Sequence, residues 1–84
     1  MDTSELYSKL IIPHSGLVES VVLVAWLVAD GSMVNFGDPC LIYESEKTQV
    51  QMDAPCDGLV EIMVNASDDE ILVGSLVGRI LISK

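Results

Sequence analysis

Turn-forming residues interrupt this chain at short intervals, and this spacing constrains its fold more than any other feature of the sequence. The interruptions combine glycine, proline, serine and aspartate, and they fall at 13–16, 30–32, 37–39, 57–58, 66–69 and 74. Valine and isoleucine dominate the segments between them, and these β-branched side chains suit a pleated strand better than a helix. Short strands separated by frequent turns are typical of a β-sandwich or barrel, so the spacing predicts an all-β fold.

Eight or so short strands fit between these turns. The longer candidates cover residues 6–12, 18–28, 40–44, 49–54, 59–65 and 77–82, and shorter strands are expected at 33–34 and 71–72. The apolar run 19–26 also satisfies a helical template, because a continuous apolar run fits every periodicity. Its β-branched content favours a strand there as well.

The chain nearly repeats itself when it is shifted by 37 residues. The matched pairs include Val34 with Ile71, Gly37 with Gly74, Tyr43 with Ile80 and Lys47 with Lys84. Apolar positions and one loop glycine therefore coincide in two halves of the chain. We expect a flattened barrel or sandwich of two four-stranded antiparallel sheets, related by a pseudo-twofold axis.

Length and charge limit what the chain can bind. It has 84 residues and a formal net charge of −9, which predicts one domain covering 1–84. The acidic charge opposes binding to nucleic acid and to anionic membranes. The longest apolar run, 21–29, is about half of the roughly 20 residues that a spanning helix needs, and no export signal is recognisable at the N-terminus. We expect no nucleic-acid or membrane partner, and a monomer for the isolated domain.

Cysteine and histidine offer little catalytic chemistry in this sequence. Cys40 and Cys56 show neither the spacing of a zinc site nor that of a disulfide framework, so buried free thiols are expected. His14 is the only histidine and lies in a turn between Pro13 and Ser15. A general-base role for His14 and a Cys/His nucleophile pair are open alternatives that no local signature supports.

The segment 39–55 reads as one hairpin with Glu46 and Lys47 at its tip. This register pairs Ser45 with Thr48, Glu44 with Gln49, Tyr43 with Val50 and Leu41 with Met52. It places the apolar members of these pairs on one face, as cross-strand packing requires. Glu-Lys is an unusual tip pair, since two-residue primed turns prefer glycine or asparagine at positive φ.

The predicted core is built on the apolar face of this hairpin and on the strands that follow it. Its members are Leu41, Tyr43, Val50, Met52, Val60, Ile62, Val64, Ile80 and part of 21–28, with Trp26 at one end.

Lys47 is displayed at an exposed bend beside Glu44 and Glu46. A basic or nucleophilic lysine needs desolvation or neighbouring positive charge, and these two glutamates supply neither. The arrangement suits a handle that enters the active site of another protein. The plainer interpretation is a solvated surface lysine, with glutamates that only keep the hairpin soluble.

The chain resembles the lipoyl domain of 2-oxo acid dehydrogenase complexes, in which a motif of the type E-T-D-K-A presents a modified lysine. That motif stands here as Glu44-Ser45-Glu46-Lys47-Thr48, followed at the family spacing by 54–58. Trp26 and the loop 30–38 match W-x-V-x-x-G-D-x-V-x-x-G-D, with Ser32 in place of the first aspartate. The likeness extends to Val73-Gly74 downstream and to Pro13, Gly16 and Glu19 upstream.

The resemblance implies that Lys47 is lipoylated by a lipoate–protein ligase or a lipoyl transferase. The arm would then shuttle acyl groups and electrons between a thiamine-diphosphate dehydrogenase, an acyltransferase and a flavoprotein dihydrolipoyl dehydrogenase. The domain itself would be a carrier and a substrate, not an enzyme. Glu44, Ser45, Glu46 and Thr48 would be recognition residues, and the acidic charge would steer encounters with basic partner faces.

The sequence departs from the family pattern at three places. One extra residue lies between Gly16 and Trp26, which predicts a bulge or a shifted turn. The second Gly-Asp turn has become Asp68-Asp69, which removes a glycine that could supply positive φ. Thr48 replaces the alanine that follows the modified lysine.

Two other functions share this fold. Biotinyl domains place methionine on both sides of their lysine, whereas Lys47 is flanked by Glu46 and Thr48, so lipoate is favoured over biotin. An unmodified lipoyl-like adaptor domain is the remaining alternative. The sequence fits bacterial cytoplasm, or the mitochondrial matrix if the domain is excised from a longer eukaryotic protein.

Overall fold

A computed structural model describes residues 6–82, and every regular element in that part of the chain is a strand. The eight strands are β1 (Tyr7–Ile11), β2 (Ser20–Trp26), β3 (Met33–Val34), β4 (Pro39–Ser45), β5 (Thr48–Asp53), β6 (Gly58–Ile62), β7 (Glu70–Leu72) and β8 (Leu76–Ile82). Each falls on a predicted segment, and the ambiguous run 19–26 contributes strand β2. The all-β prediction is confirmed.

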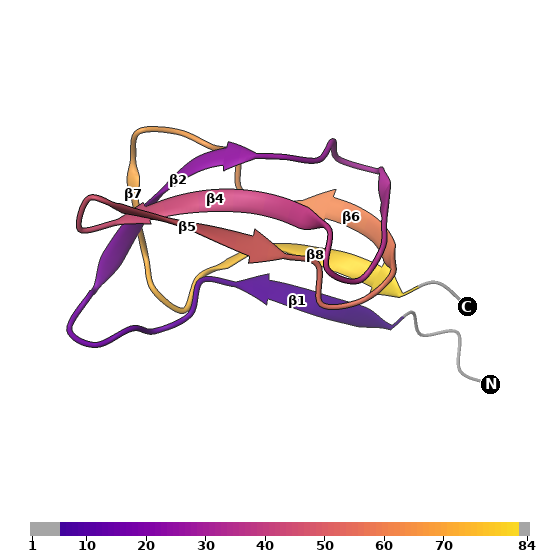
Figure 1. Cartoon of the computed structure of the whole chain (residues 1–84), viewed down its shortest axis with the longest axis horizontal. Coiled ribbons are helices and arrows are strands. Elements are labelled where there is room, and N and C mark those ends of the chain that lie inside the picture. The colour runs from indigo at the N-terminus through magenta and orange to yellow at the C-terminus, as the bar shows by residue number, and fades with distance from the viewer. Residues whose placement is uncertain (1–5, 83–84) are drawn as a thin grey trace.

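The strands form two antiparallel four-stranded sheets, with the orders β1-β8-β6-β3 and β5-β4-β2-β7. Figure 1 shows them as the two layers of a flattened, elongated sandwich. The hydrogen bonds between the described strands do not close the sheets into a barrel. This architecture is the predicted barrel-sandwich.

The topology contains the pseudo-twofold relation that the repeat predicted. A shift of 37 residues carries β2 onto β6, β3 onto β7 and β4 onto β8, and these pairs hold equivalent places in the two sheets. The loop glycines matched by the repeat, Gly37 and Gly74, adopt nearly the same φ, 89° and 87°. Lys84, which the repeat matches with Lys47, lies outside the described residues.

The core lies between the two sheets and was predicted only in part. Its fully buried members are Leu10, Ile12, Val21, Leu23, Val34, Cys40, Leu41, Tyr43, Ala54, Val60, Val77 and Ile80. The prediction was wrong about the depth of Val50, Met52, Ile62 and Val64, which are half-buried and pack against the rim of this cluster. It also missed the contribution of β1 and of the following Ile12.

Trp26 joins the two halves of the chain at the end of β2. Its ring is half-buried against the core, as predicted, and Nε1 donates a hydrogen bond of 2.8 Å to the carbonyl oxygen of Val64. Val64 follows β6, the strand that the repeat pairs with β2. The indole therefore fixes one half of the molecule against the other.

The extra residue before Trp26 is accommodated as a β-bulge. The register between β2 and β4 shifts between Leu23 and Ala25, so Val24 has no partner and its side chain is 38% exposed. A bulge absorbs one inserted residue while the flanking pairs keep their faces. Of the two predicted alternatives, a bulge and a shifted turn, the structure shows the bulge.

The Asp68-Asp69 loop forms without positive φ. The amide of Asp69 donates to the hydroxyl of Ser67 at 3.1 Å, which stabilises the bend locally. Gly31, the residue that the repeat aligns with Asp68, has a φ of 84°. The two loops thus close in different ways, and the missing glycine does not disrupt the second one.

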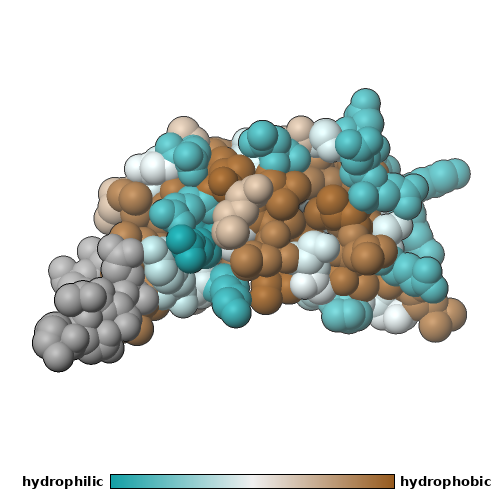
Figure 2. All heavy atoms as spheres, turned by 180° about the vertical axis from the view of Figure 1, so that it is seen from behind, coloured by the Kyte–Doolittle hydropathy of each residue, from teal (hydrophilic) through white to brown (hydrophobic). Residues whose placement is uncertain are grey.

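The β4–β5 turn lies at one end of the long axis, and the start of β1 and the end of β8 lie at the other (Figure 1). Figure 2 shows the face turned away in Figure 1, where apolar side chains gather along the middle of the molecule between polar groups. The described residues contain no helix that could cross a membrane.

Candidate functional site

The β4–β5 hairpin has the predicted register. Ser45 pairs with Thr48, Glu44 with Gln49, Tyr43 with Val50 and Leu41 with Met52. The alternation of apolar and polar residues favours this register over others, because a one-residue slip would turn the apolar face toward solvent. The pairing leaves Glu46 and Lys47 as a two-residue turn.

Both turn residues adopt a left-handed backbone conformation, with a φ of 49° at Glu46 and 69° at Lys47. They are the non-glycine residues with positive φ in the described part of the chain. A primed two-residue turn requires this conformation because its twist matches that of the strands. The strand register therefore imposes a conformation that neither side chain favours, and backbone strain of this kind concentrates at functional sites.

The side chain of Lys47 is exposed and forms no ion pair with any described residue, although Glu44 and Glu46 are close in sequence. Arg79 differs, since its guanidinium pairs with Glu61 and lies 3.7 Å from the centroid of the Tyr7 ring. The ε-amine at the hairpin tip is therefore accessible to a second protein.

The two symmetry-related outer faces carry different chemistry. On the sheet that bears the hairpin, Val22 pairs with both Glu44 and Glu70. The residues that the 37-residue shift places at the equivalent positions are all apolar: Leu59, Leu81 and Met33. At these matched positions the sheet that displays Lys47 carries acidic groups, whereas the other sheet is apolar there and its Glu61 is paired with Arg79.

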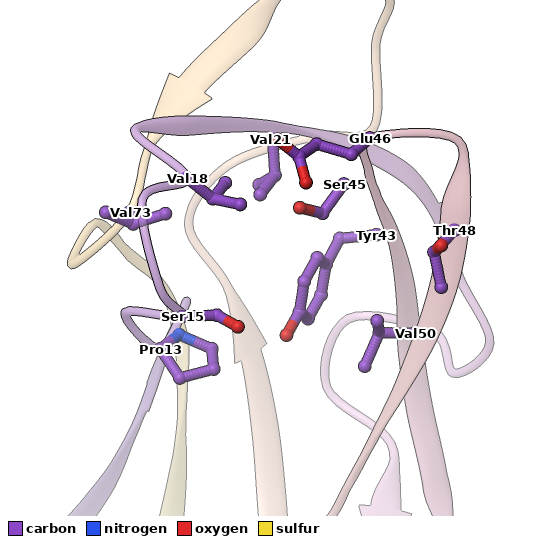
Figure 3. Close-up of a pocket in the computed structure, with 10 residues that line it drawn as sticks. All are labelled: Pro13, Ser15, Val18, Val21, Tyr43, Ser45, Glu46, Thr48, Val50 and Val73. Atoms are coloured by element: carbon purple, nitrogen blue, oxygen red, sulfur yellow. The ribbon is translucent and has the colours of Figure 1, made fainter.

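A groove of about 280 Å³ opens beside the hairpin (Figure 3). Ser45, Glu46 and Thr48 line one side of it, whereas Glu44 belongs to the outer face of the sheet. The opposite wall comes from the β1–β2 connection and from Val73. The structure therefore divides the predicted recognition residues between a groove and an outer face.

Sequence reasoning did not identify this groove. Its walls come from segments near residues 13–21, 43–50 and 73, which are distant in the chain. The only available signal was that Pro13 and Val73 belong to the spaced pattern shared with lipoyl domains. That pattern carried no information that the two positions face the hairpin across one cavity.

The two cysteines are free thiols, but they differ in depth. Cys40 is fully buried as expected, whereas Cys56 is only half-buried, so that part of the prediction was wrong. Burial raises the pKa of the Cys40 thiol, and the nearby carboxylates of Asp38 and Asp53 raise it further. Cys40 is therefore an inert core residue.

His14 is exposed in the β1–β2 connection. It lies beside Gly74, where an added Cβ would stand 3.0 Å from its Cε1 atom. The part of the chain covered by the structure contains no cluster of three or more histidine, cysteine or acidic residues placed to hold a metal ion.

Comparisons with known proteins agree with this geometry. The Biotin_lipoyl family model, described as biotin-requiring enzyme, matches residues 8–80. Two similar proteins are named dihydrolipoyllysine-residue succinyltransferase component of 2-oxoglutarate dehydrogenase complex. The protein from Rickettsia felis is 29% identical over 73 residues, and the one from Rickettsia bellii is 27% identical over the same length. The matched segment is 86% of this chain but only 18% of each relative, so the chain spans a small part of their length.

Proposed function

The chain belongs to the biotinyl/lipoyl attachment family, and from that premise we propose that it is a lipoyl carrier domain with the lipoyl group bound covalently at Lys47. One observation carries the proposal: the tip of the β4–β5 hairpin presents an exposed lysine with no ion pair to a described residue. A primary amine on a narrow projecting turn can enter the active site of a modifying enzyme without disturbing the sheets behind it.

The residues present fit the group. In our proposal the neutral ε-amine of Lys47 attacks the activated carboxyl group of lipoate, a C–N bond forms, the adenylate leaves and the amine loses a proton. The lysine exchanges its positive charge for an amide. When bound, the dithiolane supplies a disulfide that opens to accept an acyl group and electrons and closes when both have been passed on.

The other residues of the chain orient and present this arm. The strained turn holds Lys47 at the outermost point of the hairpin, and the pairs Ser45–Thr48 and Glu44–Gln49 anchor the turn to the sheet. Glu44 and Glu46 give the surface around Lys47 a negative charge, which favours partner enzymes with a basic face. Ser45 and Thr48 would complete the recognition surface.

Lipoate is favoured over biotin for two reasons. The flanks of Lys47 are Glu46 and Thr48, where biotinyl domains place methionine. The names of the Rickettsia relatives contain dihydrolipoyllysine. A biotin carrier domain of a carboxylase is the second candidate because one family model covers both modifications.

We propose that the partners are a thiamine-diphosphate dehydrogenase, an acyltransferase and a flavoprotein dihydrolipoyl dehydrogenase, with 2-oxoglutarate as the first substrate to test. The domain would work as a monomeric carrier in bacterial cytoplasm or in the mitochondrial matrix. An unmodified adaptor role predicts none of these partners.

The test is the intact mass of the purified chain after incubation with a lipoate–protein ligase, ATP and lipoate, with biotin and a biotin ligase in a parallel reaction. We expect the gain of one lipoyl group in the wild type and none in Lys47→Arg, because a guanidinium is not an acceptor for the acyl group. A gain of biotin alone would contradict the proposal, and no gain in a folded sample would favour the adaptor.

The recognition role of the glutamates requires a separate measurement. Glu44→Gln with Glu46→Gln should lower the kcat/KM of the ligase, whereas Glu61→Gln, which removes an acid from the other sheet, should not. An unchanged rate in the double variant would leave the glutamates with only a solubility role.

A further inference from the structure

The groove beside the hairpin has walls of mixed polarity around the ring of Tyr43, with valines on its sides and serine, threonine and glutamate at its rim. Val18 and Val73 form one side, Val50 lies opposite, and the ring of Tyr43 stands between them (Figure 3). The volume of about 280 Å³ is just below the roughly 300–1,000 Å³ that is typical of ligand clefts. Such a groove admits a small ring with a short chain and excludes a folded peptide segment.

The phenol of Tyr43 is an unused hydrogen-bonding group. Its side chain is 7% exposed, and its hydroxyl forms no hydrogen bond with any described residue. Figure 3 shows this hydroxyl directed into the groove, on the side of Ser15. No buried side-chain oxygen among the described residues lacks a partner, so this hydroxyl is open to the groove, and a polar group of a ligand there can replace solvent as its hydrogen-bond partner.

The groove begins at the attachment point of the proposed arm. Glu46 and Thr48, the two neighbours of Lys47, both line it. A flexible chain joined to the exposed ε-amine of Lys47 can therefore fold back over the opening of the groove. The side chain of Glu46 at the rim disfavours a negatively charged occupant and accepts a neutral one.

From this geometry, and on the basis of the proposed function, we infer that the lipoyl arm on Lys47 folds back and places its dithiolane ring in the groove between Val18, Val50 and Val73. The ring is neutral and apolar, which suits the three valine side chains. The arm amide or a ring sulfur meets the hydroxyl of Tyr43. The carrier then alternates between a docked arm and an extended arm that visits partner enzymes.

The docked state has a consequence outside the reactions of the carrier. A dithiolane covered on several sides by valine side chains is less accessible to a dissolved reductant than the same ring in free lipoamide. The reduction of the protein-bound dithiolane by a water-soluble phosphine should therefore be severalfold slower.

Nuclear magnetic resonance of the chain before and after lipoylation tests the inference, once intact mass shows complete modification. We expect amide shifts at Val18 and Val73 in addition to those at the hairpin tip, and nuclear Overhauser contacts between ring protons and the methyl groups of Val18 and Val50. Shifts confined to residues 45–49 in fully lipoylated protein would overturn docking and leave the proposed function intact. Failure of lipoylation itself would overturn both.

Two variants give the second readout. Val18→Phe fills the groove and should return the reduction rate to that of free lipoamide, whereas Val24→Phe, at the exposed bulge of β2, should keep the slow rate. Tyr43→Phe retains the ring but removes the hydroxyl, so the reduction rate should rise part of the way toward that of free lipoamide. A reduction rate equal to that of lipoamide in the wild type, or equal rates in Val18→Phe and Val24→Phe, would contradict the docked arm.

Discussion

Replacing Glu46 by glycine should stabilise the domain, although Glu46 lies in the turn that presents the functional lysine. Its φ of 49° is in the left-handed region, where a residue with a Cβ atom costs about 1–2 kcal/mol. Glycine removes this cost but loses about 0.5–1 kcal/mol through its greater freedom in the unfolded chain. With the midpoint of each range, the net gain in the free energy of unfolding is about 0.75 kcal/mol.

This gain corresponds to a rise of about 3–6 °C in Tm, since 1 kcal/mol shifts a domain of this size by about 4–8 °C. A thermal melt followed by circular dichroism measures it. Glu44→Gly is the matched control, because Glu44 lies in β4 with ordinary strand geometry and glycine there should lower Tm. A fall in Tm for Glu46→Gly comparable to that of Glu44→Gly would refute the idea that the tip is strained.

Further predictions concern the core and the cysteines. Ile80→Ala should lower the free energy of unfolding by about 2–5 kcal/mol, because Ile80 is 0% exposed. Ile62→Ala should lower it clearly less, because Ile62 is half-buried at the rim of the core, and urea unfolding measures both losses. Iodoacetamide should label Cys56 well before Cys40, as intact mass over time reports. The raised pKa of Cys40 implies that the free energy of unfolding falls as pH rises above about 8.5, because the unfolded thiol ionises there and the folded one does not. Urea unfolding at several pH values measures this slope, and Cys40→Ala should flatten it.

Each of these predictions has a result that would contradict it. Equal losses in Ile80→Ala and Ile62→Ala would show that the depth of the core is wrongly assigned. Labelling of both cysteines at one rate would mean that Cys40 is accessible. A slope in alkaline solution that persists unchanged in Cys40→Ala would have to arise from another group.

The hairpin was predictable because two independent constraints agree on it. Alternation along 41–52 fixes which side chains share a face, and a two-residue tip fixes the register once Glu46 and Lys47 are placed there. The bulge at Val24 was predictable for a similar reason, since one extra residue in a strand has few ways to be absorbed.

The depth of the core was not predictable in the same way. Alternation indicates which side of a strand faces inward, but not how completely the second sheet covers it. Ile62 and Val64 face the core near the end of β6 and just beyond it, so they remain half-buried. Leu10 and Ile12 are buried on either side of the exposed Ile11, and a run of three apolar residues did not indicate which of them face inward.

The conformation of the tip and the groove depend on tertiary structure. Local preference disfavours positive φ at Glu46 and Lys47, and the pairing of the flanking strands overrides it. The groove exists because the β1–β2 connection and Val73 are brought against the hairpin by two sheets whose strands are not consecutive in sequence.

The central claim is that Lys47 carries an acyl-accepting lipoyl arm, and acyl transfer tests it most directly. The lipoylated chain would be incubated with a thiamine-diphosphate 2-oxo acid dehydrogenase and its substrate, first 2-oxoglutarate and then pyruvate, and its intact mass measured. The account predicts the gain of one acyl group that hydroxylamine removes and that Lys47→Arg never acquires. Fully lipoylated protein that gains no acyl group from either pair, while a known lipoyl domain does, would contradict it.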